Sequence, residues 1–304
     1  MKKSLQVSAL LLTALLGANV VAADFQQGLV EIKTEPRTNN LFPELCASPG
    51  DNQFGPDGHY YTTNKVAEFA GVSPDVNREI TLFSQAPDDL SLSYSATAVA
   101  IWGVVWIPYR QRIVNTLHSL HGGHQHAVET RRTLLAAKIK NFNLNTTDPE
   151  ELWKVGFLIH ALGDSYAHVH GEGKTLKAYN QVWGHAWDSL FGHNPDDLSK
   201  NPDALKNYLA YAEALYTALD RTSPPSAENR ARFDAWVVGV KAGGISPFPE
   251  AAKLKFGTLP CDSREEAKQI LSIPKVNEYL KGIEYDLDHP PVAASLTAPT
   301  PQDE

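Results

Sequence analysis

The chain has 304 residues, of which 42% are hydrophobic and 20% are charged, and its formal net charge is −8 at pH 7. This length is enough for one large domain or two small ones with a buried core. The negative charge supplies no basic surface to attract nucleic acid, so no stable nucleic-acid partner is expected. Bound cations can still hold a phosphate group locally.

The first residues have the pattern of a secretory signal peptide. Two lysines precede an apolar run over residues 5–16, and small residues follow it. The run is too short to span a membrane comfortably. We therefore expect residues 1–23 to be a signal peptide and the mature protein to be exported, either periplasmic or secreted. Residues 24–289 are expected to form one domain, and the Pro-rich and acidic residues 290–304 a disordered tail.

The chain has two cysteines, Cys46 and Cys261. In an exported protein an even number permits one disulfide, which would tie the N-terminal region to a late loop. Two separate buried thiols are the alternative. Neither cysteine belongs to a CxxC pair, so a cysteine-rich zinc site is not supported.

Start signals predict a series of helices. Prolines in the first turn, as at Pro74 and Pro149, and acidic residues after Asp148 are typical of helix starts. The predicted helices cover residues 59–70, 76–86, 128–140, 149–170, 174–191, 202–219, 227–240 and 264–271. No internal repeat and no series of alternating strand patterns is found. The sequence therefore predicts an all-α fold, a single multi-helix bundle.

Residues 96–108 form the only long apolar run after the predicted signal peptide. It is too short to cross a membrane. One interpretation is a buried segment of the core. The other is an apolar surface, with Trp102 and Trp106, that makes peripheral contact with lipid.

All of the eleven histidines except His289 lie between His59 and His193. His160, Asp164 and His168 are spaced four residues apart, so they share one helical stripe whose outer members are about 12 Å apart. One ion with bonds of about 2.0–2.2 Å cannot easily take all three. We expect His160 and His168 to bind different ions and Asp164 to bridge them, because a carboxylate can span ions about 3.5–4 Å apart.

A bundle must supply further ligands from other helices, so that the metal site lies between helices. His118 closes an apolar stretch, whereas His124 and His126 follow two glycines and are expected to be exposed. His185 and Asp188 lie three residues apart, a spacing that lets both reach one ion. The remaining candidates are His59 at the start of the first helix, Asp88 and Asp89 at the end of the second, and His170 as an alternative to His168.

The order of these residues resembles that of the zinc-dependent phospholipase C and single-strand nuclease superfamily. The resemblance extends from about His59 to Asp197, and the segment around Asp164 is also similar to a bacterial branch with a His-Ala-x-x-Asp-x-x-Ala-His pattern. Members of the superfamily are all-α and bind three zinc ions in a cleft. The family's N-terminal tryptophan ligand has no counterpart near the predicted mature N-terminus.

The resemblance implies a ligand set for each zinc ion. The first ion would be held by Asp88 or Asp89, His118, His160 and Asp164. The second would be held by His168 or His170, by His185, and by Asp188 or, alternatively, Asp196 or Asp197. The third would be held by His59 and Asp164. Two or three zinc ions are therefore expected.

The expected reaction is hydrolysis of a phosphodiester. Zinc lowers the pKa of bound water to about 7, and two or three cations neutralise the charge that develops on phosphate. Asp88 or Asp89 could orient the attacking water. A phospholipase C acting on phosphoglycerides is the first hypothesis, and a secreted nuclease or other phosphodiesterase is the second. A non-catalytic protein with closed metal sites is the third.

Overall fold

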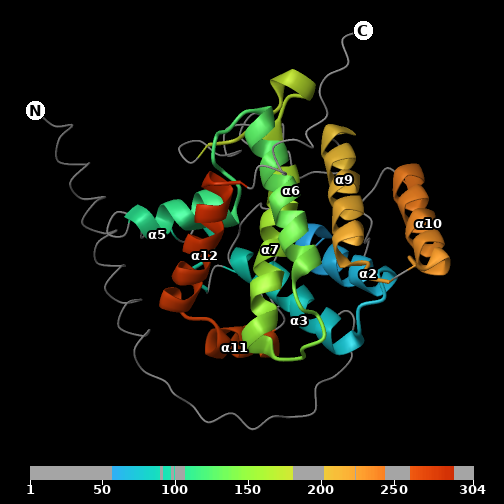
Figure 1. Cartoon of the computed structure of the whole chain (residues 1–304), viewed down its shortest axis with the longest axis horizontal. Helices are drawn as coiled ribbons and strands as arrows, with labels where there is room; N and C mark the ends of the chain where they lie inside the picture. The colour runs from blue at the N-terminus through green and yellow to red at the C-terminus, as the bar shows by residue number, and fades with distance from the viewer. Residues whose placement is uncertain are drawn as a thin grey trace, which may run out of the picture. The chain divides into compact units, whose positions relative to one another are not determined.

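A computed structural model describes residues 57–89, 92–96, 99, 107–180, 202–222, 224–243 and 261–290. These residues belong to one unit of the chain, Glu44–Glu304. Within them the regular structure is almost entirely helical, with one sheet of two short strands (Figure 1). The predicted all-α fold is confirmed.

The described part of the chain begins with the π-helical turn η1 (Asp57–Tyr61), the α-helices α2 (Thr62–Phe69) and α3 (Pro74–Gln85), and the 3-10 turn η2 (Ala86–Asp88). It continues with α5 (Ile107–Gln111), η3 (Arg112–Leu117), α6 (Gln125–Asn141) and α7 (Pro149–Ala167). The elements β1 (Val169–His170), η4 (Gly173–Thr175) and β2 (Lys177–Ala178) follow. The last helices are α9 (Pro202–Leu219), α10 (Ala227–Gly243), α11 (Cys261–Ile270) and α12 (Ile273–Asp288).

Helix α7 is the central element, because it packs against α3, α6 and α9. Its start follows the local rules: the Asp148 side chain accepts a hydrogen bond from the Glu150 backbone N–H at 3.0 Å, and proline occupies the first turn. A Cβ atom on Gly156 would lie 2.8 Å from the backbone carbon of Phe83. Glycine therefore permits the close approach of α3 and α7.

The apolar core has two main clusters of buried side chains. One joins α2, α3, α6, α7, α9 and α10, and the other joins α3, η3, α7, α11 and α12. Helix α7 contributes to both, so its two sides are covered. Among the described helices, none combines the length and the hydropathy needed to cross a bilayer.

Two of the predicted helices have different ends in the structure. The helix expected over 149–170 ends at Ala167, because the next residues turn into β1, where Val169 pairs with Ala178. The prediction of a helix that begins at Lys174 is wrong for the described residues at its start, where a short turn, η4, leads into β2. Gly171 and Gly173 have φ angles of 75° and 52°, a left-handed conformation that a continuous helix would not allow.

Several predictions fall on residues that the structure does not describe. These are the signal peptide at 1–23, the tail beyond residue 290, the Cys46–Cys261 pairing, most of the apolar run 96–108, and His185 with Asp188. Of the apolar run, Ile107 begins α5 and is 58% exposed. Helix α12 and the helical turns of residues 107–117 are additions that the sequence patterns did not predict.

Candidate metal centre

Five side chains from four separate segments, one of which is α7, lie close together and are here called the cluster. Their exposed fractions are 1% for His59, 8% for Asp88, 0% for His118, 0% for His160 and 2% for Asp164. His59 lies in η1, Asp88 lies in η2 and His118 directly follows η3. His160 and Asp164 lie on α7. Both η1 and η3 are π-helical turns, an irregularity often found at functional sites.

Asp164 is the centre of the cluster. Its Oδ1 atom lies 3.0 Å from His59 Nε2. Its Oδ2 atom lies 3.0 Å from His118 Nδ1 and 3.2 Å from His160 Nε2. One carboxylate therefore contacts three imidazoles through two different oxygens.

Asp88 repeats this arrangement from the other segment. Its Oδ2 atom lies 3.7 Å from His59 Nε2, and its Oδ1 atom lies 3.8 Å from His160 Nε2 and 4.0 Å from His118 Nδ1. Each carboxylate thus turns one oxygen toward His59 and the other toward the His118–His160 pair.

Backbone carbonyls fix the orientation of two of the imidazoles. His118 Nε2 lies 2.9 Å from the carbonyl oxygen of Tyr94, and His160 Nδ1 lies 2.9 Å from that of Ser84. A carbonyl only accepts, so the N–H of each ring points outward, and in a neutral ring the nitrogen facing the cluster carries a lone pair. Those two nitrogens are 3.2 Å apart and both lie beside Asp164. The arrangement requires a proton or a cation between them.

The loop that follows His118 is held against α7. Ser119 has a φ angle of 54°, which is uncommon for a residue with a side chain, and its hydroxyl donates to the carbonyl of Ala161 at 3.1 Å. The strained turn places His118 where it faces Asp164.

The protonation of the cluster reflects these contacts. Burial alone would raise the pKa of Asp164, but the charges of His168 and His160 and hydrogen bonds from His118 and His160 hold it well below its usual range. Burial alone would lower the pKa of His59, but the hydrogen bond and charge of Asp164 and the charge of Asp88 raise it. Without a metal ion Asp164 is therefore ionised and His59 holds its proton more tightly than a free imidazole, and a metal ion bound to His59 has to displace that proton.

The structure separates the two pairs of alternatives. Asp88 faces the cluster, whereas Asp89 forms a salt bridge with Arg264, whose Nε lies 3.0 Å from Asp89 Oδ2. His168 is buried, with Nδ1 donating to the carbonyl of His118 at 2.6 Å and lying 3.6 Å from Asp164 Oδ2. His170 is exposed and lies outside the cluster. His124 and His126 are exposed as predicted.

Two residues near the cluster were not singled out by the sequence. A Cβ atom on Gly163 would lie 2.9 Å from His59 Cε1 and 3.2 Å from Tyr211 Cζ, so a side chain at this position would press on both rings. Burial raises the pKa of Tyr211, the Thr63 hydroxyl lowers it, and the charge of Asp164 raises it further. The signal available in the sequence was a glycine inside an otherwise good helix.

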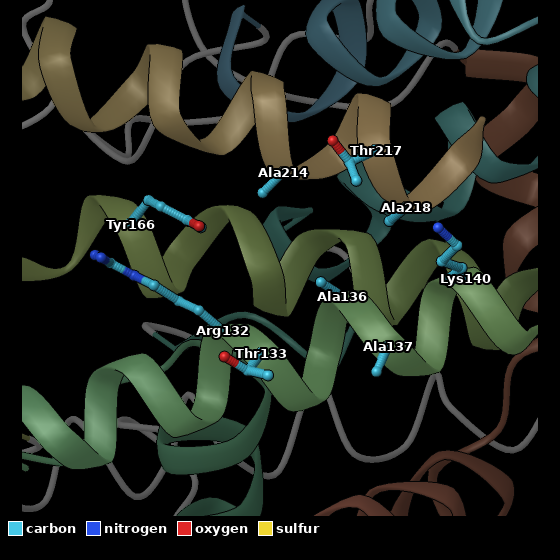
Figure 2. A pocket seen from close by; sticks show the side chains of 9 residues that line it. All are labelled: Arg132, Thr133, Ala136, Ala137, Lys140, Tyr166, Ala214, Thr217 and Ala218. Carbon is cyan, nitrogen blue, oxygen red and sulfur yellow. The ribbon is translucent and has the colours of Figure 1, made fainter. Parts of the chain in front are cut away.

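A pocket of about 340 Å³ lies between α6, α7 and α9 (Figure 2). None of the residues that line it belongs to the cluster. Arg132 on its wall donates from Nε and Nη2 to the carbonyl of Ser165, at 3.1 and 2.9 Å, and lies 3.9 Å from the Tyr166 ring centre. Its guanidinium therefore supports the end of α7.

The geometry of the cluster is that of a site that can hold a metal ion. Two groups of buried side chains, His59 with Asp88 and His160, and His118 with His160 and Asp164, present ligand atoms within 4.8 Å of one another. Comparison with protein-family models, with curated proteins and with solved structures finds no match for this chain. The chemistry of the cluster must therefore be argued from its own residues.

Proposed function

We propose that the chain is an exported, zinc-dependent phosphodiester hydrolase, as its resemblance to the phospholipase C and nuclease superfamily implies. The observation that carries the proposal is the pair of carboxylates, Asp88 and Asp164, each directed at two groups of imidazoles. A carboxylate shared in this way is the ordinary bridge between two closely spaced cations.

The first position fits a tetrahedral ion. Bonds of about 2.0–2.2 Å place tetrahedral ligand atoms about 3.3–3.6 Å apart. His118 Nδ1, His160 Nε2 and Asp164 Oδ2 are separated by 3.0–3.2 Å, and Asp88 Oδ1 lies 3.8 and 4.0 Å from the two nitrogens. These separations bracket the expected value, and the fixed ring N–H groups leave the right nitrogens free to bind.

The second position would be held by His59 Nε2, Asp164 Oδ1 and Asp88 Oδ2. The nitrogen lies 3.0 and 3.7 Å from the two oxygens. Three protein ligands leave a place for water or substrate, which is the usual arrangement of a catalytic zinc site. Three ligands among the described residues therefore favour a catalytic site over a closed, non-catalytic one.

Bound zinc would supply an activated water at neutral pH and would neutralise the charge on a phosphodiester. The chain's own residues would do the positioning: Asp88 and Asp164 would set the distance between the two positions, and the carbonyls of Ser84 and Tyr94 would orient the imidazoles. The net charge of −8 favours a phospholipid or another small phosphodiester over nucleic acid. Phospholipase C remains the narrower form of the proposal, with membrane contact through residues 96–108.

A non-catalytic metal-binding protein is the second candidate. It is favoured by the burial of all five side chains, none more than 8% exposed, and by Asp88, which would be the fourth protein ligand of the first position. Structural zinc sites are closed in this way, with four protein ligands.

Elemental analysis of the purified chain, followed by assays with a phosphocholine ester and with single-stranded DNA, tests both candidates. The proposal expects about two zinc ions or more per chain and hydrolysis of at least one ester that a chelator abolishes. Zinc without any hydrolysis would favour the non-catalytic candidate. A chain that binds no metal ion would exclude both.

A further inference from the structure

Two tyrosine–threonine pairs lie next to each other between α9 and α2. The Tyr208 hydroxyl is 2.6 Å from the hydroxyl of Thr62, and both groups are buried. Tyr211 and Thr63 repeat this combination one helical turn later on α9. The hydroxyl oxygens of Tyr211 and Thr63 are also buried, and neither meets a partner at hydrogen-bond distance and angle within the described part of the chain. Burial raises the pKa of Tyr211, but the Thr63 hydroxyl lies close enough to the phenol to lower it, so the group that lacks a partner is the phenol O–H as a donor.

The Tyr211 hydroxyl lies beside the cluster. Tyr211 is 3% exposed. Its ring and the imidazole of His59 both lie against Gly163, because a Cβ atom there would be 3.2 Å from Tyr211 Cζ and 2.9 Å from His59 Cε1. His59 belongs to the proposed position for which the described residues supply three protein ligands. The phenol is therefore adjacent to the part of the cluster where a further ligand would bind.

A buried hydroxyl without a partner loses its hydrogen bonds to water and gains none in return. Such a group in a native structure calls for a partner that the described residues do not supply. A phenol donates one O–H, and the acceptor beside a cation site is an oxygen that the cation attracts.

We propose that Tyr211 donates its O–H to a phosphate oxygen of a ligand bound on the His59 side of the cluster, with Thr63 bonded to the phenol in that state. The inference rests on the proposed function and names Tyr211 as a substrate-binding residue. Its partner is a phosphoryl oxygen, which is shared by phosphodiester substrates and by inorganic phosphate.

The test compares Tyr211→Phe with the matched control Tyr208→Phe in the full zinc-loaded chain, with inorganic phosphate as the probe. Tyr211→Phe should keep the wild-type zinc content and should raise the phosphate dissociation constant about tenfold or more, the loss expected for a hydrogen bond to a charged group. Tyr208→Phe should leave phosphate binding unchanged.

Urea unfolding of the zinc-free proteins supplies a second readout. Tyr208→Phe should lower the denaturation midpoint because it breaks a buried hydrogen bond, whereas Tyr211→Phe should leave it unchanged or raise it. Unchanged phosphate affinity in Tyr211→Phe would overturn the inference, as would a midpoint lowered as much as in Tyr208→Phe. A zinc-loaded wild type that binds no phosphate would also overturn it. A wild type that binds no zinc would instead refute the proposed function.

Discussion

Helix α7 has an apolar half, residues 152–159, and a half that carries His160 and Asp164, residues 160–167, and both halves are largely buried. In the first half burial stabilises the fold, by about 1.5–3 kcal/mol for each large apolar side chain. In the second half burial disfavours the charged groups unless a partner compensates them. One helix thus supplies both apolar side chains that stabilise the bundle and the charged groups of a site that can hold a metal ion.

The sharpest test of this contrast is Asp164→Asn. The amide cannot supply two anionic oxygens, so zinc content should fall by more than tenfold, toward none, at both proposed positions. Elemental analysis after dialysis measures the change. Leu152→Ala, in the apolar half of the same helix, is the matched control and should keep wild-type zinc content. Equal metal content in Asp164→Asn and wild type would refute the proposed cluster.

The apolar half should respond in the opposite way. Leu152 is fully buried, so Leu152→Ala should lower the free energy of unfolding by about 2–5 kcal/mol. Urea unfolding should give the same loss with zinc and with a chelator, because the side chain packs in the core and not on the cluster. A loss that appears only in the zinc-loaded protein would show that the two halves are not independent.

The adjacent residues Asp88 and Asp89 allow the effect of removing a cluster carboxylate to be compared with that of removing a salt-bridged one. Asp88→Asn should weaken zinc binding with little change in the stability of the zinc-free chain. Asp89→Asn should remove the charge that pairs with Arg264 and lower the unfolding free energy by about 1.5–3 kcal/mol, while zinc content stays at the wild-type level. Metal analysis gives the zinc content and urea unfolding gives the free energy of unfolding of each variant. Loss of zinc in Asp89→Asn but not in Asp88→Asn would assign the ligand to Asp89.

The pH dependence of stability should differ between the zinc-free and zinc-loaded chains. The folded-state pKa of His59 lies above its usual 6.5. Its contribution to the free energy of unfolding is therefore present below pH 6.5 and is lost as the pH rises through the folded-state pKa. The folded-state pKa of Asp164 lies below its usual 3.8. Its contribution to the free energy of unfolding is therefore present above pH 3.8 and is lost as the pH falls through the folded-state pKa. Thermal unfolding of the zinc-free chain should therefore show a loss above pH 6.5. Zinc should remove that loss, since it binds the deprotonated ring. A zinc-free chain that gains stability above pH 6.5 would contradict this.

The smallest expected effects come from glycines within helices. A Cβ atom on Gly282, in α12, meets nothing within 4 Å, so Gly282→Ala should stabilise the chain by about 0.5–1 kcal/mol through helix propensity. Gly163→Ala should lack this gain and weaken zinc binding, because its Cβ atom would press on His59. Thermal unfolding and zinc titration of the two variants make the comparison. Equal stabilisation by both substitutions would show that the His59 ring can move aside.

Much of the fold was accessible from the sequence because local signals control helix starts. The first-turn proline and acidic residues of α7 and the proline of α3 predicted both helices correctly. The end of α7 was missed because it depends on the pairing of Val169 with Ala178, a contact between segments. For the same reason the helix expected from Lys174 was wrong at its described start.

The sequence by itself determined that His160 and Asp164 share one face of a helix, since a four-residue spacing fixes that relation in any α-helix. It also supplied the residue types of a site that can hold a metal ion, and their order along the chain. Only the tertiary structure decided which residue of each pair lies close to Asp164 and its imidazoles, because Asp88 and Asp89, or His168 and His170, are equivalent in pattern and differ only in what lies opposite them. Arg264 holds Asp89 aside, and the carbonyl of His118 holds His168 beside Asp164. Such choices depend on residues distant in sequence, and helical periodicity carries no information about them.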